Sequence, residues 1–164
     1  MDKRNNIFPR VLALSVILAG LLAYLYVGQM YIASGPSMTP TIYDGERIVV
    51  DKKVYDSVPP RRGDVVALIS PDRGRYFVKR IVAEAKDEVE VSQSGITVNG
   101  EMLSRTEGPW QPQEYTLALD EVYVLGDNRY NSMDSRDFGP IKAKKVIGKV
   151  KVVVWPPSSW RIVK

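Results

Sequence analysis

Ser37 is the leading candidate for a nucleophile in this chain. It lies in the segment Ser34–Thr41, which reads SGPSMTPT, in a sequence of 164 residues that contains no histidine and no cysteine. A serine nucleophile needs a neighbouring base to accept its proton. Because imidazole and thiol groups are both absent, that base is a lysine, a carboxylate or an N-terminal amine. The composition therefore favours a pair of serine and lysine side chains.

Lys79 is the lysine whose surroundings best suit a base. A catalytic lysine must lose its proton near neutral pH, so its pKa has to fall from about 10.4 to about 7–8, which burial away from water can produce. Most lysines lie in loop-like segments or near the C-terminus, whereas Lys79 lies among bulky apolar residues in Tyr76–Val82. Strand alternation alone would direct this side chain to solvent, and that is the default interpretation for an arbitrary lysine in a strand.

A polar segment, Gly126–Gly139, supports the pairing of Ser37 with Lys79. It reads GDNRYNSMDSRDFG and directly follows the apolar stretch Val122–Leu125. This composition predicts a hydrogen-bonded loop at the end of a sheet, where functional residues often gather. A calcium-binding loop or a decorated turn is the alternative, although the spacing does not match the EF-hand pattern.

The segment Val11–Gly28 is apolar throughout, and no charged residue occurs between Arg10 and Asp44. About 20 apolar residues in a helix cross the hydrocarbon core of a bilayer, which predicts a single membrane anchor. Lys3, Arg4 and Arg10 precede it, so the positive-inside rule places the N-terminus in the cytoplasm and the remainder outside. A cleaved signal peptide and a buried core helix are the alternatives. The length of the apolar run and the lack of an Ala-x-Ala site argue against the first, and the lack of a polar face argues against the second.

Beyond the anchor, the sequence predicts one mainly β domain. Short stretches rich in valine and isoleucine, several of them alternating with polar residues, are typical of half-buried strands. These stretches are Arg47–Asp51, Asp64–Ser70, Tyr76–Glu84, Glu88–Gln93, Ile96–Asn99, Glu101–Leu103, Glu121–Leu125 and Ile147–Trp155. Asn99-Gly100 predicts a tight hairpin turn, and a short helix is expected near Lys142–Val146. Residues 1–31 are thus the cytoplasmic N-terminus and anchor, and residues 32–164 the extracytoplasmic domain.

Composition also narrows the classes of partner and cofactor. Without cysteine the chain has no disulfide framework and no thiolate metal site, and neither a metal nor a cofactor is expected. The net charge of +4 is modest, and nucleic acid is not expected as a partner. From Lys142 onward the chain has seven Lys or Arg and no acid. Contact with anionic lipid and simple solvation are both open interpretations of this basic region.

Four motifs occur in order along the chain, namely Ser37-Met38-x-Pro40-Thr41, Arg62-Gly63-Asp64-Val65, Lys79-Arg80 and, within Gly126–Gly139, Gly-Asp-Asn followed by Ser-x-Asp-Ser-Arg. Together with the anchor they resemble the type I signal peptidases of bacteria, over essentially the whole chain. The resemblance implies a β-rich Ser/Lys endopeptidase that is anchored in the plasma membrane and removes signal peptides from secreted preproteins at the outer face. It also implies a preference for small residues at the −1 and −3 positions.

Carried over residue by residue, the resemblance assigns roles to five residues. Ser37 matches the nucleophile and Lys79 the general base. Ser132 matches the serine that hydrogen-bonds the lysine. Asp134 and Arg136 match the ion pair that braces the polar loop. These roles are chemically reasonable, because a neutral lysine accepts the serine proton and later passes it to the leaving amine.

The oxyanion hole departs from part of the family. Many Gram-negative members have a serine hydroxyl two positions before the nucleophile, whereas this chain has Gly35, as do many Gram-positive members. The proline between them has no N–H, so the amide of Ser37 is the main backbone donor and the amide of Gly35 the second candidate.

Other residues near the motifs are expected to be structural or to meet the membrane. Asp127 is expected to cap backbone groups, and Arg80 to face the side of its strand opposite to the lysine. An exposed apolar surface near the nucleophile is expected to include Met38, Trp110 or Trp155 and to contact the lipid bilayer.

Three alternatives to a secretory signal peptidase remain. An organellar processing peptidase of the same family would carry a transit peptide, and nothing resembling one precedes the anchor. A catalytically inactive accessory subunit on the same fold would not need the complete set of five residues. A self-cleaving Ser/Lys repressor would carry a DNA-binding module in place of an anchor.

Overall fold

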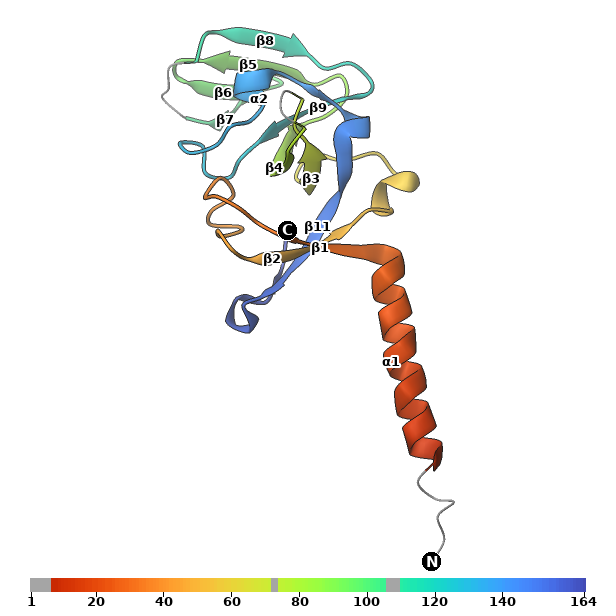
Figure 1. The fold of residues 1–164 in the computed structure, drawn as a ribbon. Coiled ribbons are helices and arrows are strands. Elements are labelled where there is room, and N and C mark those ends of the chain that lie inside the picture. The colour runs from red at the N-terminus through yellow and green to blue at the C-terminus, as the bar shows by residue number, and fades with distance from the viewer. Residues whose placement is uncertain (1–6, 72–73, 106–109) are drawn as a thin grey trace, which may run out of the picture.

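The computed structural model of the chain describes residues 7–71, 74–105 and 110–164. Its first element, α1 (Ile7–Val27), projects from a β-rich body that contains the rest of the chain (Figure 1). Within the described ranges, no helix reaches the combination of length and apolarity needed for a membrane span. Strand β1 (Gly28–Ile32) follows α1 directly and belongs to the body, so the expected division between residues 31 and 32 falls inside this strand.

The larger of the two sheets has eight strands, in the order β1-β2-β11-β3-β4-β9-β10, with β12 paired to β11. All of its pairings are antiparallel. Beyond β1, its strands are β2 (Arg47–Asp51), β3 (Val65–Ile69), β4 (Tyr76–Ala83), β9 (Glu121–Leu125), β10 (Ile141–Lys142), β11 (Val146–Trp155) and β12 (Arg161–Ile162). The long strand β11 pairs through its first half with β3, through its second half with β2, and at Val152 and Val153 also with β12, so this one strand connects most of the sheet.

The smaller sheet has four strands, in the order β7-β6-β5-β8, and lies at the end of the body farthest from α1 (Figure 1). Its strands are β5 (Glu88–Ser92), β6 (Gly95–Val98), β7 (Glu101–Ser104) and β8 (Gln113–Thr116). Asn99 and Gly100 connect β6 to β7 with φ values of 52° and 77°. A two-residue hairpin turn requires these left-handed conformations. The predicted hairpin is confirmed.

Short helical turns complete the fold. They are α2 (Ser135–Phe138) and the 3-10 turns η2 (Val54–Asp56), η3 (Ala143–Lys145) and η4 (Pro157–Ser159). The turn η3 confirms the short helix expected near Lys142–Val146. All eight predicted strand segments contain a strand, and the mainly β fold is confirmed. Strands β1, β8, β10 and β12 lie outside the predicted segments. Most of β1 falls in residues 1–31, which were assigned to the anchor, and the other three strands have only two to four residues.

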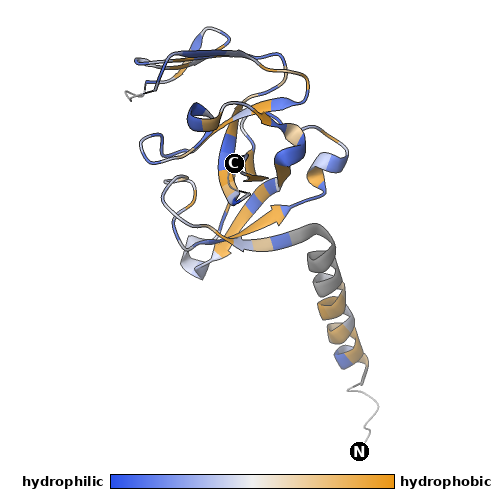
Figure 2. Ribbon diagram, turned by 45° about the horizontal axis from the view of Figure 1, so that its top comes forward, coloured by the Kyte–Doolittle hydropathy of each residue, from blue (hydrophilic) through white to orange (hydrophobic). Residues whose placement is uncertain are grey.

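Buried aliphatic side chains hold the segment after Ser37 against the larger sheet, whose strands are largely hydrophobic (orange in Figure 2). Met38 and Ile42 are 3% and 1% exposed and pack in one cluster with side chains of β2 and β11. Full burial of each such side chain contributes about 1.5–3 kcal/mol. The expectation that Met38 belongs to an exposed surface is therefore wrong, because this side chain anchors the segment. Trp110 is half-buried against the cluster under the smaller sheet and is likewise not part of a surface near Ser37.

Candidate active site

Ser37 lies in a turn shortly after β1. Gly35 begins this turn with a φ of 86°, a left-handed value that glycine adopts without strain. The amide of Ile42 donates to the carbonyl of Met38 at 2.9 Å, and both of these side chains are buried. The base of the turn is thus fixed, and the half-buried Ser37 directs its hydroxyl toward Lys79.

Lys79 lies on β4 in the interior of the larger sheet and is only 3% exposed. Its Nζ donates to Ser37 Oγ at 2.8 Å. The ring of Phe77, two positions earlier on the same strand, lies 5.2 Å from Nζ. The default interpretation, in which this lysine points to solvent, is wrong. The structure brings together two residues that lie far apart in the sequence and could act as nucleophile and base.

Burial lowers the pKa of Lys79 from 10.5 to about 8. The carboxylate of Asp134 opposes this fall in the pKa, and the guanidinium of Arg136 reinforces it. With a pKa of about 8, about a tenth of the molecules carry the neutral amine at pH 7. A neutral amine at hydrogen-bond distance from a serine hydroxyl is a competent general base.

Asp134 and Arg136 form a buried ion pair at the start of α2. Arg136 Nε and Nη2 donate to the two carboxylate oxygens at 2.8 and 2.9 Å, and neither side chain is exposed. Asp134 also caps α2 and accepts a hydrogen bond from the amide of Gly126 at 2.9 Å. The Arg136 guanidinium stacks on Trp110, with Cζ 4.3 Å from the ring centre. The ion pair thus connects Gly126, the first residue of the polar loop, to α2 near the end of the loop, and this restrains the loop conformation.

The polar loop also directly holds the turn of residues 35–42, named the nucleophile turn after the candidate nucleophile Ser37. The amide of Asn128 donates to the carbonyl of Ser37 at 3.0 Å, and Asn128 Nδ2 donates to Thr39 Oγ1 at 3.1 Å. Gly126 lies so close to the turn that a Cβ atom there would be 2.5 Å from the Ser37 carbonyl oxygen. The loop therefore acts as the wall against which the turn is positioned.

Ser132 lies in this wall but does not make the expected hydrogen bond to Lys79. Its Oγ is buried and has no hydrogen-bond partner among the described residues. It occupies the space where a side chain of Gly126 would begin, 2.2 Å from the ideal Cβ position. The hydrogen bond that the structure gives to the Lys79 amine is the one with Ser37 Oγ.

The amide of Gly35 is not available as an oxyanion donor, contrary to expectation. It donates to Asp44 Oδ1 at 2.7 Å, which closes the loop between β1 and β2. A donor committed to a carboxylate cannot also bind a developing oxyanion. The amide of Ser37, by contrast, has no acceptor within the described part of the chain. It is the backbone donor that remains.

Asp127 pairs with Arg80 and does not act as the backbone cap that was expected. Arg80 Nε and Nη2 each donate to one Asp127 oxygen at 2.8 Å, and Thr41 Oγ1 donates to Oδ2 at 2.5 Å. Burial raises the pKa of Asp127, but these hydrogen bonds outweigh it and hold the pKa below its ordinary value. Local sequence does not reveal this pair, because nothing near Asp127 specifies which distant arginine it meets.

The carboxylates of the polar loop do not converge on a common point, as a calcium loop would require. Asp127 and Asp134 are each bound by an arginine. No group of three or more acidic, histidine or cysteine side chains suited to a metal ion occurs in residues 7–71, 74–105 and 110–164.

A pocket of about 110 Å³ opens beside Ser37 and Lys79. Its walls come from the end of β1, the nucleophile turn, β3 and β4. They include the apolar side chains of Ala33, Met38, Ile42, Ala67, Phe77 and Val78. A larger groove, of about 560 Å³, lies on the smaller sheet beside Glu88, Glu90 and Glu114 and contains no pair of nucleophile and base. Of these two pockets, only the smaller one adjoins Ser37 and Lys79.

The family described as signal peptidase, peptidase S26, matches residues 6–155. The chain belongs to the signal peptidase family. It is 33% identical to the probable signal peptidase I-1 of Synechocystis sp., with 92% of this chain and 82% of that protein covered. It is 30% identical to signal peptidase I P of Bacillus subtilis subsp. natto, with coverages of 94% and 92%. A solved structure of a signal peptidase I from Enterococcus faecalis V583 is 30% identical, with a TM-score of 0.46 over 55% of this chain and 95% of that one.

Like these relatives, the chain is a hydrolase of the signal peptidase I type. Substitution of Gly126 by alanine should lower its kcat on the order of 100-fold, because the new methyl group would displace Ser132 Oγ and the Ser37 carbonyl. Steady-state cleavage of a signal-peptide substrate measures this effect. Gly100→Ala is the control, since it strains a remote turn with a φ of 77° and nothing within 4 Å of the new Cβ. Equal turnover in the two variants would contradict the close fit at Gly126.

Proposed function

We propose that this member of the signal peptidase family is a membrane-bound serine endopeptidase that removes N-terminal signal peptides from secreted preproteins. Ser37 is the nucleophile and Lys79 the general base. The observation that carries the proposal is the 2.8 Å separation of Lys79 Nζ and Ser37 Oγ, with the amine buried and its pKa lowered. The complete motif set argues against an inactive accessory subunit.

In the proposed cycle, the neutral amine of Lys79 accepts the Ser37 hydroxyl proton as Oγ bonds to the scissile carbonyl carbon. The carbonyl oxygen becomes an oxyanion, which the free amide of Ser37 is placed to stabilise. The ammonium of Lys79 then gives its proton to the leaving nitrogen, the C–N bond breaks, and an acyl-enzyme remains. Lys79, neutral again, accepts a proton from the water molecule that attacks the acyl carbon. The Lys79 ammonium then returns that proton to Ser37 Oγ as the ester C–O bond breaks, which restores Ser37 and releases the carboxylic acid product.

Substrate choice follows from the pocket beside the nucleophile. Its volume of about 110 Å³ and apolar lining favour small apolar side chains over bulky or charged ones. This supports the proposed preference for small residues, such as alanine, at the −1 and −3 positions. Secreted preproteins of bacteria are the proposed substrates, in keeping with the bacterial relatives.

Substitution of either member of the pair tests the mechanism. Ser37→Ala and Lys79→Met should each remove nearly all cleavage of a preprotein with alanine at −1 and −3, and the double variant should lose little more. Lys79→Met should also stabilise the folded chain at pH 7. The lowered pKa corresponds to a cost on the order of 3 kcal/mol, at about 1.36 kcal/mol per pKa unit. Sequencing of the new N-terminus shows the cleavage site. Substantial activity in either single variant would refute the proposed roles.

The pH dependence of kcat/KM shows which group acts as the general base. Only the neutral amine accepts a proton, so kcat/KM should rise about tenfold per pH unit below pH 8 and level off above it. A carboxylate base with an ordinary pKa would give a flat profile from pH 6 to 9. A flat profile for this enzyme would therefore exclude Lys79 as the base.

We further propose that α1 anchors the chain in the bacterial plasma membrane, with the N-terminus in the cytoplasm. The helix has 21 residues, which at about 1.5 Å each extend over about 31 Å, close to the thickness of a hydrocarbon core. Its apolar side chains between Phe8 and Leu18 are exposed to the extent of 56–80%, so they lack partners within the protein. The basic residues before Val11 support a cytoplasmic N-terminus.

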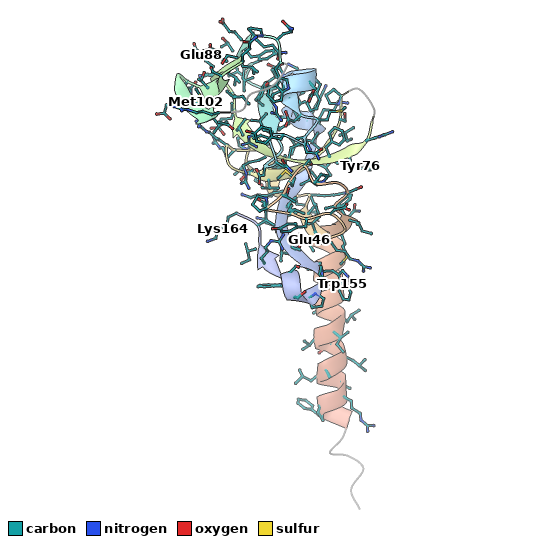
Figure 3. The ribbon with its side chains drawn as sticks, turned by 90° about the vertical axis from the view of Figure 1, so that its left-hand side faces the viewer. Glu46, Tyr76, Glu88, Met102, Trp155 and Lys164 are labelled. Atoms are coloured by element: carbon teal, nitrogen blue, oxygen red, sulfur yellow. The ribbon has the colours of Figure 1, made fainter. Side chains whose placement is uncertain are left out.

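An exposed apolar face of the larger sheet supports lipid contact by the body itself. Two neighbouring rows cross the sheet in register, Ile32 with Arg47 and Trp155, and Met30 with Val49, Val152 and Ile162. Of these, Met30, Ile32, Trp155 and Ile162 are 43–67% exposed. The face begins within β1, directly after α1, and Trp155 lies at the α1 end of the body, opposite Glu88 and Met102 (Figure 3). The bilayer that surrounds the anchor is therefore its proposed partner.

A double substitution tests this face. Trp155→Ser combined with Ile162→Ser should lower cleavage of a preprotein in liposomes on the order of tenfold, because removal of two large exposed apolar groups weakens membrane contact by about 1–3 kcal/mol. Cleavage of a short soluble peptide should change little. Met102→Ser, at the far end of the body, is the matched control. An equal fall with both substrates would place these two residues in catalysis or stability, against the proposal.

A further inference from the structure

The C-terminal segment, residues 160–164, packs beside the nucleophile turn. Strand β12 pairs with β11, and Val163, 7% exposed, joins the hydrophobic cluster that contains Met38 and Ile42. The amide of Val163 donates to the carbonyl of Lys151 at 2.9 Å. This segment lies beyond residue 155, where the family match ends, and the four motifs include none of its residues.

Arg161 connects this segment to residues 41–46, because it binds both Thr41 and Glu46 at the two ends of that stretch. Its Nε and Nη2 donate to the Thr41 carbonyl at 3.1 and 2.7 Å. Nη1 and Nη2 donate to the two Glu46 carboxylate oxygens at 2.9 and 2.5 Å. Glu46 is only 3% exposed, and the pairing with Arg161 holds its pKa below the ordinary value. A planar guanidinium can make these contacts at once, whereas a lysine ammonium cannot reproduce the fork.

Thr41 links this arrangement to the base. Its Oγ1 donates to Asp127, which is bound by Arg80, the residue next to Lys79. Arg80 Nη1 also donates to the main-chain oxygen of Lys164 at 2.9 Å. The C-terminal segment therefore holds the nucleophile turn through Arg161 and the strand of the base through Lys164. Figure 3 shows Glu46 and Lys164 at the same level of the body.

We propose that Arg161 is a positioning residue for the reaction, which fixes Ser37 against Lys79 by holding the Thr41 carbonyl. Thr41 is four residues after Ser37, in the same turn, and the polar loop also holds this turn through Asn128. Arg161 touches neither member of the pair, so it acts on their separation and not on the proton transfer itself. The inference rests on the proposed function of Ser37 and Lys79.

The test separates positioning from stability. Arg161→Gln should lower kcat about 10- to 100-fold, as a displacement of about 1 Å between reacting groups does, with little change in KM. The midpoint of the pH profile should stay near that of the parent, because Lys79 remains buried. Arg161→Lys can restore a charge pair with Glu46, so it should recover the thermal midpoint but not kcat. All measurements use the full chain in detergent, at temperatures far below unfolding.

Arg61→Gln is the matched control, because it removes an exposed Arg–Glu pair, with Glu84 at 3.3 Å, away from the site. Its kcat should equal that of the parent. If Arg161→Gln keeps the parent kcat, or Arg161→Lys restores kcat along with stability, Arg161 is only structural and the inference is wrong. Ser37→Ala is measured in parallel. Activity in that variant would overturn the proposed function itself, whereas an inactive Ser37→Ala with a fully active Arg161→Gln would overturn the positioning role alone.

Discussion

The burial of one amine beside one serine is the constraint on which the rest of this structure depends. Lys79 is 3% exposed, and its lowered pKa corresponds to a cost on the order of 3 kcal/mol. The larger sheet offsets this cost with fully buried side chains on the strands around β4, such as Val66, Leu68 and Val124. Each contributes about 1.5–3 kcal/mol. Because an unpaired buried lysine does not stabilise a fold, its presence at hydrogen-bond distance from Ser37 favours a chemical role.

The two ion pairs of the polar loop oppose the rise in the pKa of that amine that its carboxylates would otherwise cause. Carboxylates close to a lysine favour its charged form and would raise its pKa. Asp127 and Asp134 are such carboxylates, and each is bound through both oxygens by an arginine. The Asp134 carboxylate raises the pKa of Lys79, and the Arg136 guanidinium offsets part of that rise. The arginines thus let the loop use carboxylates as rigid braces at a reduced cost to the neutral form of Lys79.

Much of the fold and the central pair of the site could be predicted from the sequence, because the signals are local or compositional. Valine-rich alternation marks the strands, and the absence of histidine and cysteine leaves Lys79 as the best base for Ser37. The predictions that were wrong concern hydrogen-bond partners that are distant in the sequence and are brought together only by the tertiary structure. Nothing local shows that the amide of Gly35 is taken by Asp44, or that Arg161 reaches Thr41. These hydrogen bonds join backbone groups to common charged side chains, so the sequence does not show which of many possible partners each group binds.

The direct junction of α1 and β1 determines where the site can work. If α1 is the anchor, the first strand of the body begins at the residue after the helix, and its five residues extend over about 17 Å at about 3.3 Å each. Ser37 follows five residues after the strand ends, in a turn that the sheet, the polar loop and the C-terminal segment all hold. The height of the nucleophile above the bilayer is therefore set by the geometry of a paired strand and not by a flexible tether. Under this proposal a substrate must present its cleavage site at that height, which adds a positional requirement to the proposed preference for small side chains.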